Sequence, residues 1–361
     1  MKRIECEKRK EYRTINMSLG QFNNLYWKEW AYYAFSKEEI WLIKETSERL
    51  HKMYLETAKY LIDNDLLSEI WLEGEIAKKA KESFVANDFY LYWRFDFIFD
   101  WENIKLLEYN AQTPVSLIET SLIQLQWKED LFPKNYQFNN LHHNLKKRWS
   151  YFPSESIDFS CYVTEEISWG VYQEDVSNVD YLKLTAELAG KKTRFIDTKS
   201  IEVVDWKFMS NGEVLKNLFL LVPYEYYDEA ELEWTLVTNV VEPIWKIILQ
   251  SKAFMAFLYK RYPKEKSLLR TEFTPFPWAI VSKPFYSREW LDIHIYDNGS
   301  LVEKKEKTIY QEYYKCPEFN EHRPNIWSWM IWDECSWIMV RESDSRVITS
   351  ENCNFIPHII I

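Results

Sequence analysis

Hydrophobic residues recur at helical spacing between residues 36 and 63. The positions that share one face are Ile40, Ile43, Leu50, Tyr54 and Leu61. Ser36, followed three residues later by Glu39, forms a capping-box sequence at the start of this segment. We therefore expect a long amphipathic helix here, and a second, weaker helical pattern follows at residues 66–83.

A period of two replaces the helical period at residues 92–110, which is typical of β-strands. Further along, we expect helices at Leu117–Glu129, Tyr181–Gly190 and 241–262, and a buried strand at Phe219–Pro223. The last third is rich in predicted strands: Trp278–Ser282, Leu291–Tyr296, Trp327–Trp332 and Ser336–Arg341. Asp297-Asn298-Gly299 has the sequence of a hairpin turn. This mixture predicts an α+β fold.

The two strands predicted within residues 92–110 present polar side chains on one side. Three aromatic residues of the first strand alternate towards a core, and the residues that face the other way are Arg94, Asp96, Ile98 and Asp100. In the second strand the residues that share a face are Leu106, Glu108 and Asn110. A hairpin centred near Glu102 would place Asp96 opposite Glu108 and Arg94 opposite Asn110.

Two carboxylates in directly opposed positions repel each other unless a cation lies between them. Carboxylate and amide oxygens suit Mg²⁺, which takes one or two carboxylates and completes its shell with substrate phosphates. Arg94, beside such a site, could hold a phosphoryl group or an acyl phosphate. Two other interpretations stay open at this point. The hairpin could have one solvated polar face, since register can slip, or the carboxylates could be the acid/base pair of a hydrolase.

Composition narrows the class of protein. A chain of 361 residues allows two or three lobes, and 47% hydrophobic residues exclude overall disorder. A formal net charge of −11 argues against a nucleic-acid partner. No apolar stretch is long enough to span a bilayer and the N-terminus has no signal-peptide pattern, so we expect a cytoplasmic protein without a membrane partner. The five cysteines are scattered, which favours reduced thiols over a zinc site.

The amino-acid sequence of the predicted hairpin resembles that of a known protein family. Arg94-Phe95-Asp96 followed by Glu108-Tyr109-Asn110 is similar to the signature of the glutathionylspermidine synthase synthetase domain and its smaller bacterial relatives. Other segments resemble the family in the same order: Glu174-Asp175, Glu242-Pro243-Ile244-Trp245-Lys246, Ser251-Lys252-Ala253, Leu269-Arg270-Thr271-Glu272-Phe273, Lys283-Pro284, Ile309-Tyr310-Gln311, Arg341-Glu342 and Phe355-Ile356-Pro357-His358. The resemblance covers roughly residues 90–361, and the N-terminal part is less distinctive.

The resemblance implies an ATP-grasp fold with a preceding pre-ATP-grasp lobe. Residues 1–240 would form the pre-ATP-grasp, substrate-binding and metal-hairpin region, and residues 241–361 the ATP-binding lobe and closing strands. The implied activity is that of a carboxylate–amine ligase that uses ATP and Mg²⁺ and forms an amide through an acyl phosphate. Its substrates would be a small-molecule or peptide carboxylate and an amine, either a polyamine or an amino acid.

The resemblance also implies roles for the residues around the hairpin. Asp96, Glu108 and Asn110 would hold magnesium, and Arg94 and Arg341 would stabilise the transferring phosphoryl group and the tetrahedral intermediate. Phosphoryl transfer depends mostly on positioning and charge stabilisation, so these residue types suit it. The ordinary interpretation of Arg341, as an ion-pair partner on a strand, stays open.

The nucleotide residues implied by the resemblance are Lys252, Lys283, Gln311 and Arg288, with Gln311 beside the adenine. The sequence departs from the family here. The family has a glycine-rich loop after the second lysine, and this chain has Ser287-Arg288-Glu289-Trp290, which keeps the arginine without the glycines. A loop that closes over a triphosphate with its backbone amides loses freedom without glycine. A degenerate homologue that binds nucleotide or peptide without catalysis is therefore the alternative to a ligase.

The substrate-binding residues implied by the resemblance are Glu174, Asp175, Thr113 and Glu119. Glu174 and Asp175 match an acidic pair that receives the polyamine in the family, and an acidic pair suits a cationic amine. The pair could instead be the solvated start of a helix, where carboxylates favour the helix dipole. Val115 stands where glutathione-binding members carry a hydroxyl, which argues against glutathione as substrate. The chain is too short for the family's amidase domain, so we expect no hydrolytic half-reaction.

Overall fold

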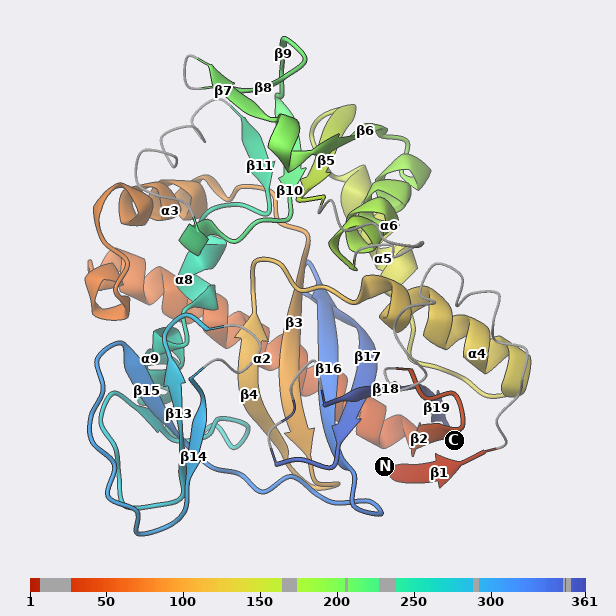
Figure 1. Cartoon of the computed structure of the whole chain (residues 1–361), viewed down its shortest axis with the longest axis vertical. Helices are drawn as coiled ribbons and strands as arrows, with labels where there is room; N and C mark the ends of the chain where they lie inside the picture. Colours follow the sequence, from red (N-terminus) through yellow and green to blue (C-terminus); the bar gives the residue numbers. More distant parts are fainter. Residues whose placement is uncertain are drawn as a thin grey trace.

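The computed structural model describes residues 1–6, 27–163, 174–204, 207–226, 238–287, 292–346, 348 and 352–361. A five-stranded antiparallel sheet in the order β18-β17-β16-β3-β4 lies at the centre (Figure 1). Its strands are β3 (Tyr92–Phe99), β4 (Ile104–Asn110), β16 (Arg323–Ile331), β17 (Glu334–Ser343) and β18 (Asn354–Ile356). The sheet thus joins the predicted hairpin to the last strands of the chain.

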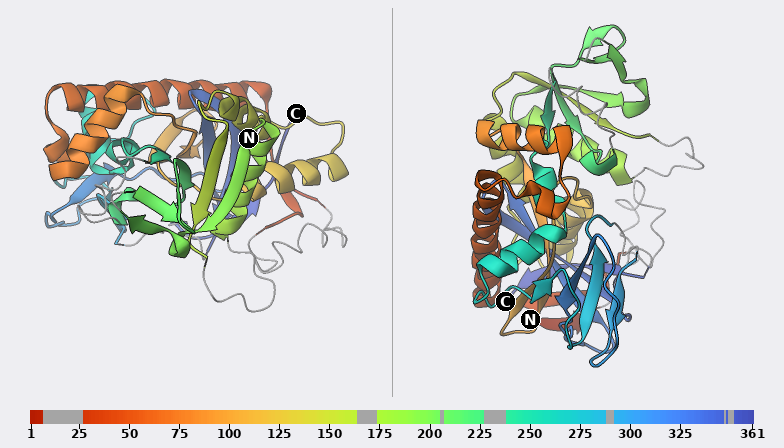
Figure 2. Two further views of the ribbon diagram at one scale, coloured as in Figure 1. Left: turned by 90° about the horizontal axis from the view of Figure 1, so that it is seen from above. Right: turned by 90° about the vertical axis from the view of Figure 1, so that its left-hand side faces the viewer.

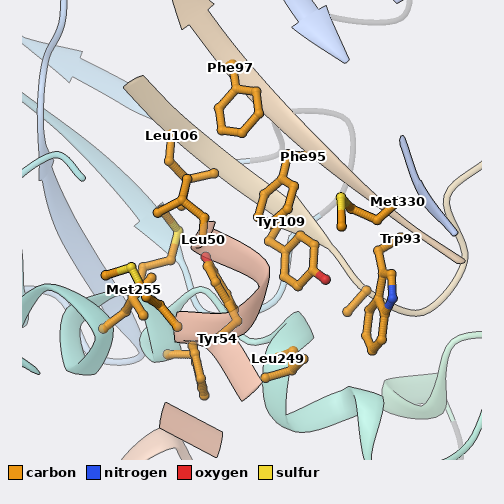
Figure 3. Packing of buried hydrophobic residues seen from close by; sticks show 14 of the residues in the cluster. Leu50, Tyr54, Trp93, Phe95, Phe97, Leu106, Tyr109, Leu249, Met255 and Met330 are labelled. Carbon is orange, nitrogen blue, oxygen red and sulfur yellow. The ribbon is translucent and has the colours of Figure 1, made fainter. Parts of the chain in front are cut away.

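The long helix α2 (Lys37–Asp63) covers one face of this sheet. Its predicted capping box is confirmed, because Ser36 Oγ accepts from Glu39 N at 3.2 Å and Glu39 Oε2 accepts from Ser36 N at 2.8 Å. Tyr54 packs its ring 4.5 Å from that of Tyr109, which lies 4.1 Å from the ring of Phe95 (Figure 3). The alternation of aromatic residues in β3 therefore builds the core beneath α2.

The described residues that cover part of the opposite face come from the middle of the chain. Helices α5 (Leu141–Ser150) and α6 (Glu174–Leu188) share a core with Trp329 and Trp337 of the central sheet. Behind them is a parallel sheet in the order β11-β10-β5-β6. Its strands are β5 (Ser156–Cys161), β6 (Lys192–Asp197), β10 (Asn217–Leu220) and β11 (Asn239–Val241). Polar residues of β3 and β17 outside this core remain available for a site.

A second antiparallel sheet, in the order β12-β15-β13-β14, lies beside β4 (Figures 1 and 2). Its strands are β12 (Thr271–Glu272), β13 (Ile280–Pro284), β14 (His294–Tyr296) and β15 (Thr308–Glu312). The remaining α-helices of the described residues are α3 (Gly74–Ala86), α4 (Gln124–Leu131), α8 (Lys246–Gln250) and α9 (Ala253–Arg261). Two small sheets complete the fold: β1 (Lys2–Glu5), β2 (Ala31–Phe35) and β19 (His358–Ile360), and β7 (Glu202–Val204), β8 (Lys207–Ser210) and β9 (Glu213–Val214).

The predicted mixture of helices and strands is confirmed, with several local corrections. Residues 66–83 form a short 3₁₀ helix (Leu67–Ile70) followed by α3, and residues 241–262 form α8 and α9 in place of one helix. The helix predicted from Leu117 begins with a π-helical turn (Glu119–Ile123). No helix in the described part of the chain is long and apolar enough to cross a membrane.

Two predictions about turns and faces were wrong. Asp297 accepts a hydrogen bond from Ser300 N at 3.1 Å, so the turn forms, but β14 pairs with β13 and not with the strand that follows the turn. Leu106 does not share a face with Glu108, because a bulge between the Asp96 and Phe97 pairs shifts the register by one residue. Leu106 consequently packs beside Phe97 in the core (Figure 3).

Candidate active site

The paired strands β3 and β4 place the predicted metal ligands side by side. Asp96 lies opposite Glu108 and Arg94 opposite Asn110, so the predicted register is confirmed. All four residues line a cavity of about 220 Å³. Asn110 Nδ2 donates to Asp96 Oδ1 at 3.0 Å. Two adjacent strands therefore deliver two carboxylates, an amide and a guanidinium to one cavity.

The carboxylate of Asp96 is surrounded by donors. Arg94 Nε lies 3.1 Å from Oδ1, beside the Asn110 amide. Trp327 Nε1 donates to Oδ2 at 2.8 Å, and Arg341 Nη2 lies 3.5 Å from the same oxygen. Strand β17 is separated from β3 by β16, so the sheet brings together Arg94 and Arg341, which are far apart in the sequence.

Glu108 pairs with the first predicted ATP lysine. Lys252, which directly precedes α9, places Nζ 3.1 Å from Glu108 Oε1 and donates to Ser287 O at 2.9 Å. Burial alone would raise the pKa of Glu108, but the charges of Lys252 and Lys283 bring that pKa below its usual value. Glu108 is therefore a carboxylate at neutral pH, as a metal ligand requires.

The second predicted ATP lysine is held by the bulge in the hairpin. Lys283 Nζ donates to Leu107 O at 2.8 Å and to Gln311 Oε1 at 2.7 Å. Leu107 is the unpaired residue of the bulge. Burial lowers the pKa of Lys283 to about 8. Lys283 therefore donates to two neutral acceptors. It also lies close to Glu108, whose negative charge raises the pKa of Lys283 and so opposes the effect of burial.

The predicted substrate-binding residues divide into two groups. Thr113 and Glu174 line the same cavity as Asp96, whereas Asp175 and Glu119 are not among its lining residues. Glu174 begins α6 and accepts from Ser116 Oγ at 2.8 Å. Glu119 is buried, and burial together with the charge of Glu174 raises its pKa to about 8. Arg288 lies outside the described residues.

Several residues of the cavity were missed by sequence reasoning, and three of them make contacts that shape the site. Ser116 supports Glu174, Trp327 contacts Asp96, and Gln250 Oε1 accepts from Ala111 N at 2.9 Å. Only Gln250 had a local signal, since it directly precedes Ser251-Lys252. The other two depend on pairings between distant segments.

The motif that begins at Glu242 contacts the start of β3, which is distant from it in the sequence. Glu242 accepts from the backbone N–H groups of Leu91 and Tyr92 at 3.1 Å, and Lys246 Nζ donates to Tyr92 O at 2.7 Å. Glu242 and Lys246 form a buried ion pair. Burial lowers the pKa of Lys246 to about 8. This pair anchors the start of β3, and so supports the strand that carries Arg94 and Asp96.

The cavity residues fit a magnesium ion by their chemistry. Within the described ranges, no group of three or more His, Cys, Asp or Glu side chains is arranged to hold a metal. Asp96 and Glu108 nevertheless supply two carboxylates, and Asn110 supplies an amide. Mg²⁺ typically uses one or two protein carboxylates and takes its other ligands from water and phosphate, so a smaller protein set suits it.

Comparison with known proteins places the chain in a family of carboxylate–amine ligases. It belongs to the glutathionylspermidine synthase preATP-grasp family, whose family model matches residues 3–361. The match therefore includes the N-terminal part, where the sequence resemblance is less distinctive.

Three curated relatives are similar to the chain. A Haemophilus influenzae protein named "Putative acid--amine ligase" is 32% identical over 93% of this chain and 91% of its own length. The trypanothione synthetase of Crithidia fasciculata is 24% identical over 85% of this chain and 53% of its own length. The bifunctional glutathionylspermidine synthetase/amidase of Escherichia coli is 24% identical over 91% of this chain and 59% of its own length. The chain thus spans little more than half of the last two relatives.

Proposed function

We propose that the protein is an ATP-dependent carboxylate–amine ligase with an ATP-grasp mechanism. A substrate carboxylate attacks the γ-phosphorus of ATP, which gives an acyl phosphate and ADP. An amine then attacks the acyl carbon, inorganic phosphate leaves, and the nitrogen loses a proton to give the amide. The observation that carries the proposal is the convergence of Asp96, Glu108, Lys252 and Arg341 on one cavity.

Magnesium would be held by Asp96, Glu108 and Asn110, and it would supply charge neutralisation for the phosphates. Both carboxylates already lie next to cations, Asp96 beside Arg94 and Glu108 beside Lys252. A divalent ion brought in by a nucleotide would take over part of that pairing. The freed lysine and arginine donors would then be available to phosphate oxygens.

Lys252 and Lys283 are proposed to bind the nucleotide phosphates, with Gln311 near the base. Lys252 lines the cavity, and Lys283 donates a hydrogen bond to Gln311 on the neighbouring strand of the second antiparallel sheet. Arg288 remains a predicted ATP ligand of the loop outside the described residues. In this proposal residues 241–361 form the ATP-binding lobe and residues 1–240 the pre-ATP-grasp region.

Arg94 and Arg341 would stabilise the charge that develops on the transferring phosphoryl group and on the tetrahedral intermediate. Glu174, with Asp175 nearby, would attract the cationic amine, and Thr113 would contact the acid substrate. Glu119 lies close enough to Glu174 for the charge of Glu174 to raise its pKa. Burial and the charge of Glu174 keep Glu119 largely protonated at neutral pH, so the negative charge on the amine-binding side of the cavity is that of Glu174, which suits a polyamine or an amino acid.

The test measures ADP release by the purified chain with ATP, Mg²⁺ and pools of carboxylic acids, peptides, amino acids and polyamines. We expect ADP release that requires one acid and one amine together, with a condensed product detected by mass spectrometry. ATP binding without ADP release in any pool would favour a degenerate nucleotide-binding homologue, which the altered Ser287-Arg288-Glu289-Trp290 loop supports. Cleavage of a substrate in these pools without ATP would instead identify a hydrolase.

A further inference from the structure

We propose that Trp327 is a positioning residue that holds Arg94, Arg341 and Asp96 together as one anion-binding unit, an inference that rests on the proposed function. Trp327 belongs to β16 and is the cross-strand neighbour of Asp96. Its side chain is buried and lines the cavity. Its ring contacts side chains of both neighbouring strands, Arg94 of β3 and Arg341 of β17.

The face of the indole orders both guanidinium groups. The guanidinium carbon of Arg94 lies 3.6 Å from the centre of the Trp327 ring, and that of Arg341 lies 4.0 Å from it. A guanidinium over an aromatic face is attracted to the ring, and its N–H donors lie in its own plane, pointing away from that face. The ring contact thus orders the two cations. Arg94 directs Nε to Asp96 Oδ1 at 3.1 Å and Nη1 to Val115 O at 3.4 Å, so the donors left for an anion are mainly those of Arg341.

The donors of Arg341 are incompletely satisfied by the described residues. Its Nε is buried without a hydrogen-bond partner among them, and Nη1 has the Cys353 sulfur at 3.9 Å. Asp96 is shared between Arg341 and Arg94, so one carboxylate faces two cations. Buried donors without acceptors are costly, which favours a further anion such as phosphate at the edge of Arg341.

The edge of the same indole fixes the carboxylate. Trp327 Nε1 donates to Asp96 Oδ2 at 2.8 Å, while Asn110 Nδ2 donates to Oδ1 at 3.0 Å. These two neutral donors set the orientation of the carboxylate without competing for its charge. The face of Trp327 therefore serves the arginines and its N–H serves the metal-binding aspartate, so the two effects can be separated by substitution.

The experiment compares Trp327→Phe, which keeps an aromatic face and loses the N–H, with Trp327→Leu, which loses both. The probes are inorganic phosphate, measured by calorimetry in the presence of ADP and Mg²⁺, and Mn²⁺, measured by electron paramagnetic resonance in the presence of ADP. We expect Trp327→Phe to weaken Mn²⁺ binding about tenfold and to change phosphate affinity less than about threefold. Trp327→Leu should also weaken phosphate binding, by about tenfold.

Trp337→Phe is the matched control. Trp337 is also fully buried in the central sheet, and its Nε1 has no hydrogen-bond partner among the described residues. This variant should leave the binding of both probes unchanged, and thermal unfolding shows whether each variant is folded. If both Trp327 variants are folded and bind Mn²⁺ and phosphate like the unmodified chain, the positioning role is excluded. If the unmodified chain binds neither probe, the proposed function fails as well.

A different result would also overturn the inference. If Trp327→Leu does not fold, Trp327→Phe still decides the N–H contribution, because unchanged Mn²⁺ binding by that variant contradicts it. Equal weakening of both probes by Trp327→Phe would show that the face and the N–H have no separate roles. Only selective loss of Mn²⁺ binding in Trp327→Phe supports the arrangement described above.

Discussion

Asp96 and Glu108 lie directly opposite each other on β3 and β4, with Arg94 beside the first carboxylate and Lys252 beside the second. Carboxylates at directly opposed positions of two paired strands repel each other, so each one depends on the cation beside it. The same two cations are proposed to contact phosphate during the reaction. In the proposed mechanism the pairing would link metal binding to nucleotide binding, because a metal that joined the carboxylates would release the cations to hold the phosphates.

This relationship predicts the effect of removing Asp96. Asp96→Ala should weaken the Mg²⁺-dependent part of ATP binding by about 10–100-fold, as is typical when a metal site is disturbed. Calorimetric titration with ATP, with and without Mg²⁺, measures that part directly. Asp158→Ala is the control, because Asp158 pairs with Arg194 on the surface of the parallel sheet. Identical Mg²⁺ dependence in Asp96→Ala and in the unmodified chain would remove the metal-binding role.

A second prediction concerns pH and nucleotide affinity. Burial lowers the pKa of Lys283 to about 8, so this lysine loses its charge as the pH rises through 8. A triphosphate binds the charged form, and ATP affinity should therefore fall between pH 7 and pH 9. The pKa of Glu108 is lowered below its usual value, so Glu108 does not titrate in this range.

Lys283→Met should remove this fall and weaken ATP binding at pH 7 by about tenfold or more, the size expected for a hydrogen bond to a charged group. Lys260→Met, which changes an exposed lysine of α9, should leave both the affinity and its pH profile intact. Binding is measured by calorimetry in matched buffers from pH 7 to pH 9. A fall of equal slope in Lys283→Met would assign the titration to another group.

The hairpin of β3 and β4 shows which features of the site could be predicted from the sequence and which could not. When side chains alternate between the two faces of each strand and the centre of the turn is known, the cross-strand partners follow. The Asp96–Glu108 pair could therefore be predicted. The bulge at Leu107 could not be predicted, because one inserted residue leaves no periodic signal in the sequence. Leu106 was therefore placed on the wrong face. That same bulge exposes the carbonyl that Lys283 contacts.

The missed residues depend on long-range pairing. Trp327 contacts Asp96 only because β16 pairs with β3 in a particular register, and nothing near either residue specifies that register. Ser116 reaches Glu174 only after α6 packs beside the loop that follows β4. The role of the Glu242 motif was likewise hidden, since its partners are backbone groups of Leu91 and Tyr92. Family resemblance supplied the positions without the contacts.

A third prediction tests the buried ion pair between Glu242 and Lys246. Glu242→Ala would leave a buried ammonium unpaired and two backbone N–H groups without their acceptor, so we expect a loss of about 3–5 kcal/mol in the free energy of unfolding. Urea unfolding followed by circular dichroism measures it. Lys59→Ala breaks an exposed pair with Asp63 and should cost less than about 1 kcal/mol.

Adding Lys246→Met to Glu242→Ala should recover part of the lost stability, because the second change removes the uncompensated charge. Recovery would show that the charge, and not the missing side-chain volume, causes most of the loss. If Glu242→Ala unfolds at the same urea concentration as the unmodified chain, the pair does not anchor the start of β3.

A fourth prediction follows from the effect of Glu174 on the pKa of Glu119. The pKa of Glu119 is raised to about 8 by burial and by the charge of Glu174, whereas an unfolded glutamate titrates near 4.5. Between these two values the folded protein binds more protons than the unfolded one, so stability should fall as the pH rises from 5 to 8. Glu119→Gln cannot ionise, and its melting temperature should fall less over this range. Glu69→Gln, at an exposed position of the first 3₁₀ helix, serves as the control.

The same pair should respond to an amine. A polyamine bound beside Glu174 stabilises the ionised form of Glu119, so binding should release a proton near pH 7, and calorimetry in buffers of different ionisation enthalpy detects that release. Glu119→Gln should bind the polyamine without releasing the proton. An equal proton release in Glu119→Gln would show that another group titrates. A polyamine that binds with no proton release in the unmodified chain would place the amine away from this pair, and the amine-binding role of Glu174 would then be contradicted.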